Sequence, residues 1–170
     1  MSRVQLYFLR HADAGDPLAW EGADEERPLS PKGQRQADRL SDFLLGGGFA
    51  VDAIVSSPKR RAEQTARRLA QALGLDVRLD QRLAGSVGLA ELERIIDDAK
   101  SPGRIVLVGH DPDFSALVSR LCGTDAVSMA KGALARVDVD RPLAPGRGRL
   151  RWLVPPDLLR GSRARKGPPG

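Results

Sequence analysis

The stretch VQLYFLRHADAG, from Val4 to Gly15, decides the fold. It opens with a run of apolar and aromatic residues, a pattern typical of a strand that is buried on both faces. The segments AIVSS at 53–57 and RIVLVGH at 104–110 share this pattern. Because the apolarity is continuous rather than alternating, these strands are expected side by side in a mostly parallel sheet.

Helical patterns separate the strands. After Ser30, an expected N-cap, apolar residues recur at helical spacing until the glycines that begin at Gly46. The segment 57–74 repeats this arrangement, with Ser57 as its expected N-cap. The remaining elements are helices over 88–99 and 112–121 and two alternating strands over 133–139 and 149–154, at or near an edge of the sheet. The predicted fold class is α/β, a three-layer α/β/α sandwich with a mostly parallel central sheet.

Length and composition limit the class of protein. The chain has 170 residues, of which 41% are hydrophobic, enough for one sizeable core. No apolar stretch is long enough to span a bilayer, and the first strand begins too early to leave room for a signal peptide. We therefore expect a single domain over residues 1–159, a cytoplasmic location and no membrane partner.

The positive charge of the chain is concentrated near its end. The net charge is +5, but residues 141–170 carry eight Lys or Arg and one Asp, a net of +7, which leaves −2 for the first 140 residues. A basic tail on a nearly neutral body is usually solvated, and aromatic residues for base stacking make up only 4% of the chain. Residues 160–170 are predicted to be a basic, disordered tail, and no specific nucleic-acid partner is expected.

Charged and titratable side chains follow the ends of three predicted strands. The first strand ends in Arg10 and His11, the second runs through Ser57 into a helix with Arg61 in its first turn, and the third ends at His110. Both histidines of the chain stand at such ends. Ligands of open α/β sheets bind beyond the carboxyl ends of the strands. Cations together with free helix N–H groups predict a site for a phosphate dianion.

Helical phase separates two neighbouring arginines. Arg61 adjoins the inner, apolar stripe that begins at Ala62. Arg60 lines up instead with Gln64 and Arg67 on the outer face of the same helix. Arg61 is therefore the predicted phosphate ligand, and Arg60 is expected in solvent.

Four motifs resemble one known family. LRHADAG resembles the Arg-His-Gly signature of the histidine phosphatase superfamily, also called phosphoglycerate mutase-like, with Ala12 in place of the usual glycine. PLSPKGQRQA, SSPKRRAEQTA and VGHDPDF resemble its helix-entry segment, second arginine motif and second histidine motif, in the correct order. The short length and the RAEQT sequence are more similar to the SixA-type phosphohistidine phosphatases than to the sugar-phosphate mutases.

The resemblance implies a role for each residue of the site. His11 would be the nucleophile that accepts the phosphoryl group, and Arg10, Arg61 and His110 would bind its oxygens. Such attack needs an unprotonated ring nitrogen, which neighbouring cations favour by lowering the pKa of a histidine. Water would then cleave the phosphohistidine, and these residues require neither a metal nor an organic cofactor. Asp13 is a further candidate for substrate binding.

The chain departs from the family where many members carry a catalytic glutamate in a Leu-x-Glu pattern. Here QRLAG at 81–85 places Gly85 at that position. A phosphoester that leaves as an alkoxide needs a proton, whereas the nitrogen of a phosphoramidate can be protonated before cleavage. The missing acid therefore favours phosphohistidine as substrate. Asp13 and Glu91 are candidate substitutes; otherwise Asp13 orients Arg10 or a helix end, and Glu91 lies on a solvated helix face.

These observations predict a phosphatase that forms a covalent phosphohistidine and acts on a phosphorylated protein, such as a histidine phosphotransfer or phosphocarrier domain. A small-molecule phosphomonoesterase and a non-catalytic phosphoanion-binding module are the alternatives. Residues 13–28 hold six carboxylates and form either a solvated loop or a border of the site. In the second case their charge suits a basic or protein substrate. Lys131 is either a cation at the rim of the site or a solvated turn residue.

Overall fold

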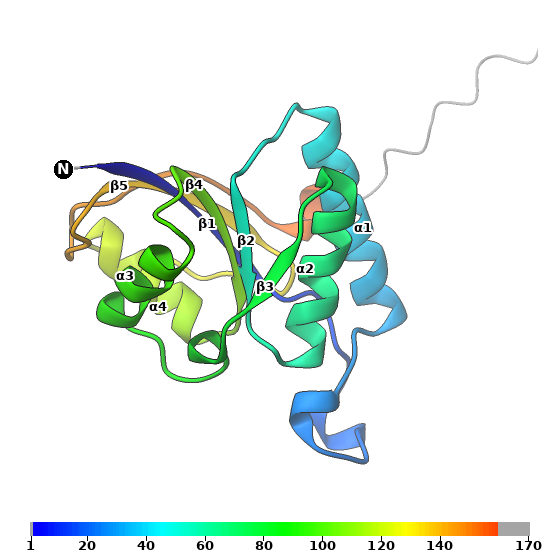
Figure 1. Ribbon diagram of the computed structural model, residues 1–170. Helices are drawn as coiled ribbons and strands as arrows, with labels where there is room; N and C mark the ends of the chain where they lie inside the picture. The colour runs from blue at the N-terminus through cyan, green and yellow to red at the C-terminus, as the bar shows by residue number, and fades with distance from the viewer. Residues whose placement is uncertain (1, 160–170) are drawn as a thin grey trace, which may run out of the picture.

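A six-stranded sheet runs through the middle of the computed structural model, which describes residues 2–159 (Figure 1). The strand order is β3-β2-β4-β1-β5-β6. The first four strands in this order pair in parallel, whereas β5 and β6 pair antiparallel, so the late strands lie at one edge as predicted. The strands are β1 (Arg3–Arg10), β2 (Ala53–Ser56), β3 (Val77–Leu79), β4 (Arg104–Gly109), β5 (Leu134–Asp140) and β6 (Arg149–Val154).

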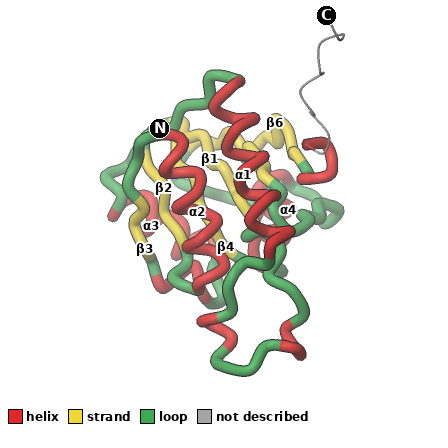
Figure 2. The backbone as a smooth tube through the Cα atoms, turned by 90° about the vertical axis from the view of Figure 1, so that its right-hand side faces the viewer, coloured by secondary structure: helices red, strands yellow, loops and turns green. Residues whose placement is uncertain are grey.

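Helices cover both faces of the sheet (Figures 1 and 2). One face carries α1 and α2, and the other carries α3 and α4. Side chains alternate along β1: Leu6 and Phe8 pack toward α3 and α4, while Tyr7 and Leu9 pack toward α1 and α2. The helices are α1 (Pro31–Gly46), α2 (Arg60–Leu73), α3 (Leu89–Asp98) and α4 (Asp113–Cys122). The predicted three-layer sandwich is confirmed, and β1 is buried on both faces because both layers lie against it.

The helix boundaries follow the predicted signals with one exception. Ser30 caps α1, since its hydroxyl accepts the Gly33 N–H at 3.0 Å. The predicted start of α2 at Ser57 is wrong, because this helix begins at Arg60 with Lys59 as its N-cap residue. The Ser57 hydroxyl accepts the Lys59 N–H at 3.2 Å and lies against a histidine, so it caps a turn that precedes the helix. The short strand β3 was also not among the predicted elements.

The start of α1 lies directly against the segment that follows β1. At Gly33 a Cβ atom would stand 1.9 Å from the backbone oxygen of Asp13, so only glycine fits there. The Ser30 N–H also donates to that oxygen at 3.0 Å. This contact fixes the N-terminus of α1 beside the carboxyl end of β1.

Between β1 and α1 the chain makes a long excursion, residues 15–26, which we call the arm. It contains two 3-10 turns, Pro17–Ala19 and Asp24–Glu26, and extends away from the sheet below α1 and α2 (Figure 1). Within residues 2–159, no helix combines the length and the apolarity that crossing a membrane requires. The predicted tail, residues 160–170, lies outside the described residues.

Candidate active site

Strand pairing brings the two histidines together. Arg10 is the register partner of Gly109, so His11 and His110 follow at the same level of neighbouring strands. The His11 N–H donates to the Gly109 oxygen at 3.0 Å, and the two imidazole centroids are 5.2 Å apart. On the other side of β4, the Ser57 N–H donates to the Val108 oxygen at 2.9 Å. The predicted convergence of three strand ends is therefore present.

His11 is held as a neutral ring in one tautomer. Its Nδ1 lies 2.7 Å from the Ala12 oxygen, and a carbonyl can only accept, so Nδ1 carries the hydrogen. The pKa of His11 is lowered to about 4, chiefly by burial and also by the charges of Arg61, Arg10 and Lys131, although the Ala12 hydrogen bond raises it. The Nε2 lone pair is therefore available at neutral pH.

His110 is oriented by a serine. Its Nε2 lies 2.7 Å from Ser57 Oγ. The Ser57 hydroxyl can donate to Nε2 while its oxygen accepts the Lys59 N–H, and in that tautomer the ring hydrogen is on Nδ1. The pKa of His110 is lowered to about 3, chiefly by burial and also by His11, Arg61 and Lys59. His110 is thus a neutral ring beside His11, and in this tautomer its Nδ1–H can donate to a ligand.

Two arginines flank the histidines. Arg10 Nη1 donates to the Met129 oxygen at 2.8 Å and lies 3.7 Å from an Asp111 carboxylate oxygen. Arg61 is only 6% exposed and its charge acts on both histidines, whereas Arg60 is exposed. The prediction from helical phase, which places Arg61 inside and Arg60 outside, is therefore confirmed.

Unpartnered donors gather at this place. Within residues 2–159, the buried side-chain nitrogens and oxygens without a hydrogen-bond partner are Arg10 Nε, Arg61 Nε and His110 Nδ1. Buried polar groups are normally paired, because an unpaired one costs about 1–3 kcal/mol. Three donors without a partner at one cluster indicate a site for a ligand rich in acceptor oxygens. Two of them belong to guanidinium groups, so the ligand is expected to be an anion such as a phosphoryl group.

Asp13 lies beside the site and is held ionised. Its Oδ2 accepts from Ser30 Oγ at 2.5 Å and from the Gly15 N–H at 3.2 Å, and its Oδ1 is 3.8 Å from Lys131 Nζ. Burial opposes the charge, but the two hydrogen bonds and the lysine hold the pKa of Asp13 below its usual range. The carboxylate orders the start of α1, and a proton donor with a lowered pKa is a poor acid. Lys131 lies at the rim, close enough to lower the pKa of His11.

Gly85, which stands where many family members carry a catalytic glutamate, has free space around it. A Cβ atom at Gly85 would meet no heavy atom within 4 Å. Glu91, the second candidate acid, accepts the Gly88 N–H at 2.9 Å at the start of α3, and backbone hydrogen bonds lower its pKa. Asp113, which the sequence did not single out, is a carboxyl whose pKa is raised by burial at the start of α4. Because their pKa values are lowered, neither Asp13 nor Glu91 holds the proton that a general acid must donate.

The sequence left open whether the loop of residues 13–28 borders the site, and in the structure Asp24 of this loop contacts Arg61. Arg61 donates to it twice, from Nη1 to the backbone oxygen at 2.9 Å and from Nη2 to Oδ2 at 3.0 Å. Arg27 Nε donates to the other carboxylate oxygen at 3.2 Å. The loop is exposed to solvent and is joined, through Asp24, to a residue of the candidate site.

Comparison with known proteins agrees with this geometry. Residues 6–91 match the sequence model of the histidine phosphatase superfamily (branch 1). The chain belongs to this family. Phosphohistidine phosphatase SixA of Escherichia coli is similar to this histidine phosphatase, with 27% identity over 168 residues that cover 95% of this chain and 99% of the relative. An uncharacterised protein of Picosynechococcus is 41% identical over 65% of this chain and 68% of its own length.

A solved structure shows the same fold. The protein histidine phosphatase SixA complexed with tungstate superimposes on this histidine phosphatase with a TM-score of 0.78 and 24% identity. The superposition covers 92% of this chain and 99% of that structure. The phosphoglycerate mutase-like fold predicted from the sequence is therefore confirmed for the chain.

The protonation of the two histidines is directly measurable, because the chain of this histidine phosphatase contains no others. We expect both rings to be neutral at pH 5.5, to titrate near pH 4 and pH 3, and to show the hydrogen of His11 on Nδ1. The lowered pKa means that each ring becomes protonated only at a pH below its ordinary 6.5. A ¹⁵N-histidine NMR titration reports both quantities, and titration of either ring near pH 6.5 would contradict the arrangement.

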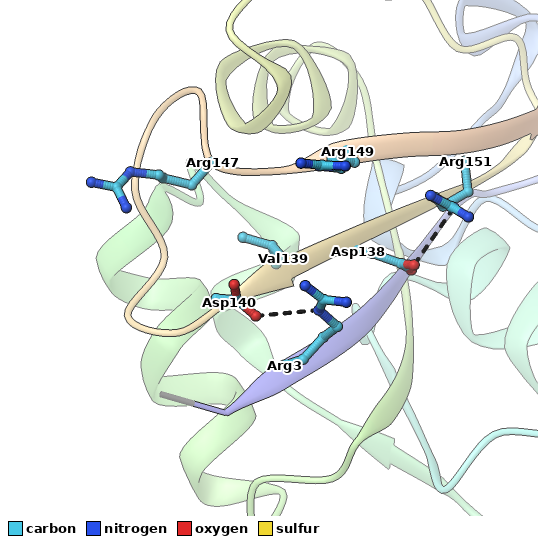
Figure 3. A pocket seen from close by; sticks show the side chains of 7 residues that line it. All are labelled: Arg3, Asp138, Val139, Asp140, Arg147, Arg149 and Arg151. Carbon is cyan, nitrogen blue, oxygen red and sulfur yellow. Dashed lines mark hydrogen bonds and ion pairs between the residues drawn. The ribbon is translucent and has the colours of Figure 1, made fainter.

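A basic groove lies at the opposite end of the sheet of this histidine phosphatase. It has a volume of about 160 Å³ and is lined by Arg3, Asp138, Val139, Asp140, Arg147, Arg149 and Arg151 (Figure 3). Arg3 pairs with Asp140 at 3.3 Å and Arg151 with Asp138 at 3.7 Å. Arg3 begins β1, whereas His11 follows its end, so an anion bound in this groove does not contact the candidate site.

Proposed function

We propose that this chain is a phosphatase that forms a covalent phosphohistidine at His11 and hydrolyses phosphohistidine on a partner protein. The observation that carries the proposal is the neutral His11 ring, with a free Nε2 lone pair, beside three unpartnered donors on Arg10, Arg61 and His110. The similarity to a phosphohistidine phosphatase over 95% of the chain supports the same reaction.

In the first step, His11 Nε2 attacks the phosphorus atom of the substrate. The N–P bond of the substrate breaks and its electron pair stays on that nitrogen. The substrate imidazole, already protonated on its other ring nitrogen, leaves as a neutral ring. Arg10 and Arg61 neutralise the charge on the transferring group, and His110 Nδ1–H donates to one of its oxygens. These contacts strengthen as charge spreads over the oxygens, so they stabilise the transition state more than the bound substrate.

In the second step, water attacks the phosphorus of phosphorylated His11. The N–P bond breaks, its electron pair returns to Nε2, and inorganic phosphate leaves as H2PO4⁻ with both protons of the water. The hydrogen bond from Nδ1 to the Ala12 oxygen keeps the ring in one orientation through both steps. The residues described need no metal for this chemistry, because the arginines supply the positive charge.

The nature of the leaving group selects the substrate class. Asp13 and Glu91 have lowered pKa values, and Gly85 offers no side chain. An alkoxide leaving group would find no proton donor among these residues, whereas a protonated imidazole needs none. This asymmetry supports a phosphohistidine substrate over a phosphomonoester.

The test compares kcat/KM for a phosphohistidine-bearing phosphocarrier protein with kcat/KM for a panel of phosphomonoesters. We expect the protein to be preferred by at least about 10-fold, and the variant Gly85→Glu to raise phosphomonoester turnover by about 10-fold, part of the 10²–10⁴-fold that a general acid supplies. Gly85→Ala is the matched control, since it adds a Cβ into the same open space without an acid.

Two outcomes would overturn the proposal. A phosphomonoester with the higher kcat/KM would make the chain a small-molecule phosphatase and would direct attention to Asp113 as its acid. Binding of phosphate without turnover of either substrate would make it a phosphoanion-binding module.

A further inference from the structure

The arm exposes apolar side chains next to the candidate site. All residues from 15 to 26 are exposed, including Leu18 at 95% and Trp20 at 37%. The arm leaves the fold four residues after His11 and projects beyond α1 and α2 (Figures 1 and 2). A tryptophan and a leucine on a projecting surface are typical of a contact with another macromolecule, because they gain free energy only when a partner covers them.

Hydrogen bonds order the arm before any partner binds. Leu18 N–H donates to Asp16 Oδ1 at 2.9 Å, and Trp20 Nε1 donates to the Ala23 oxygen at 3.0 Å. At the base, the Arg27 guanidinium, only 7% exposed, donates from Nη1 to the Ala14 oxygen at 2.8 Å. A surface ordered in advance loses less entropy on binding, so these bonds favour association.

The arm is also anchored on the residue proposed to bind the phosphoryl group. Asp24 accepts two hydrogen bonds from Arg61 and one from Arg27. Trp20 donates to Ala23, the neighbour of Asp24, so a protein seated on the arm would approach the candidate site from the side of Arg61.

The charge of the arm defines the chemistry of that protein. Residues 15–26 hold five carboxylates and no Lys or Arg. Asp24 is paired with two arginines, but Glu21, Glu25 and Glu26 have no ion-pair partner within residues 2–159. Such a surface repels small free anions and attracts a surface that carries Lys or Arg.

We infer that the arm is the docking surface for the phosphohistidine-bearing protein, and that this protein covers Leu18 and Trp20 with an apolar patch flanked by basic residues. The inference rests on the proposed function, because it names the surface through which a protein substrate reaches His11.

The experiment measures kcat/KM on two substrates, a phosphohistidine-bearing phosphocarrier protein and the small compound phosphoramidate. Leu18→Ala/Trp20→Ala should lower kcat/KM for the protein by at least about 10-fold, the size of a 1.4 kcal/mol contact loss, and change it by less than about twofold for phosphoramidate. Phe43→Ala/Leu45→Ala is the matched control, since it removes one exposed aromatic and one exposed leucine near the end of α1, away from the arm. It should leave both values unchanged.

A second variant tests the charge. Glu21→Gln/Glu25→Gln/Glu26→Gln should flatten the fall of kcat/KM with salt for the protein substrate. Equal losses on both substrates, no loss on the protein, or the same loss in the α1 control would overturn the docking surface while the proposed function stands. Wild-type protein that turns over phosphoramidate but no phosphohistidine protein would overturn the proposed function, and the docking surface with it.

Discussion

Replacing His11 by alanine should lower kcat by at least about 10⁴-fold, as the loss of a covalent nucleophile does. His11 presents an Nε2 lone pair beside Arg10, Arg61 and His110, and no other histidine remains there except His110, whose Nε2 is bound to Ser57. The measurement is the stoichiometry of phosphoenzyme, trapped during turnover of a phosphohistidine protein. Wild-type protein should yield an acid-labile, alkali-stable phosphoryl group, and His11→Ala should yield none.

The control for this result is His110→Ala. It removes a donor to the phosphoryl oxygens and keeps the nucleophile, so turnover should fall while a phosphoenzyme still forms. Thermal unfolding of both variants shows whether either change acts through the fold, since both rings are buried. A labelled His11→Ala protein, or a wild-type protein that never carries label during turnover, would exclude the covalent mechanism.

Part of the site could be read from the sequence because it depends on regular structure. Buried strands in a parallel sheet end at one edge, so His11 and His110 could be placed together from strand patterns alone. Helical phase then separated Arg61 from Arg60, because an apolar stripe fixes which side of a helix faces the core.

Other features depend on contacts that no local pattern encodes. The Asp24–Arg61 pair joins residues 37 positions apart across an irregular loop. The loop contains several carboxylates, and no sequence pattern distinguishes the one that binds Arg61. Ser57 was predicted as a helix cap, since serine before proline usually is one. Its hydroxyl instead lies 2.7 Å from His110 Nε2, and α2 begins later. Both contacts join side chains from distant parts of the chain.

Replacing Arg61 by alanine should lower kcat/KM by about 10²–10³-fold, the usual cost of removing a donor that stabilises transition-state charge. The Arg61 side chain is 7% exposed, its Nε is without a partner, and Asp24 fixes its other nitrogens. Arg60→Ala should change kcat/KM by less than about twofold, as exposed substitutions do. The measurement is steady-state turnover of the phosphohistidine protein by the two variants, with vanadate binding as an independent readout of the anion site.

The variant Arg61→Lys separates charge from geometry. Because the cation of Arg61 lowers the pKa of both histidines, Arg61→Ala should raise both pKa values toward 6.5, whereas Arg61→Lys should leave them near their wild-type values. Lysine lacks the planar guanidinium that bonds Asp24 and orients Nε toward the phosphoryl group. Arg61→Lys should therefore still lose most of the rate. Full activity in Arg61→Lys would show that the charge alone suffices. A larger loss in Arg60→Ala than in Arg61→Ala would place the phosphoryl group on the other face of α2.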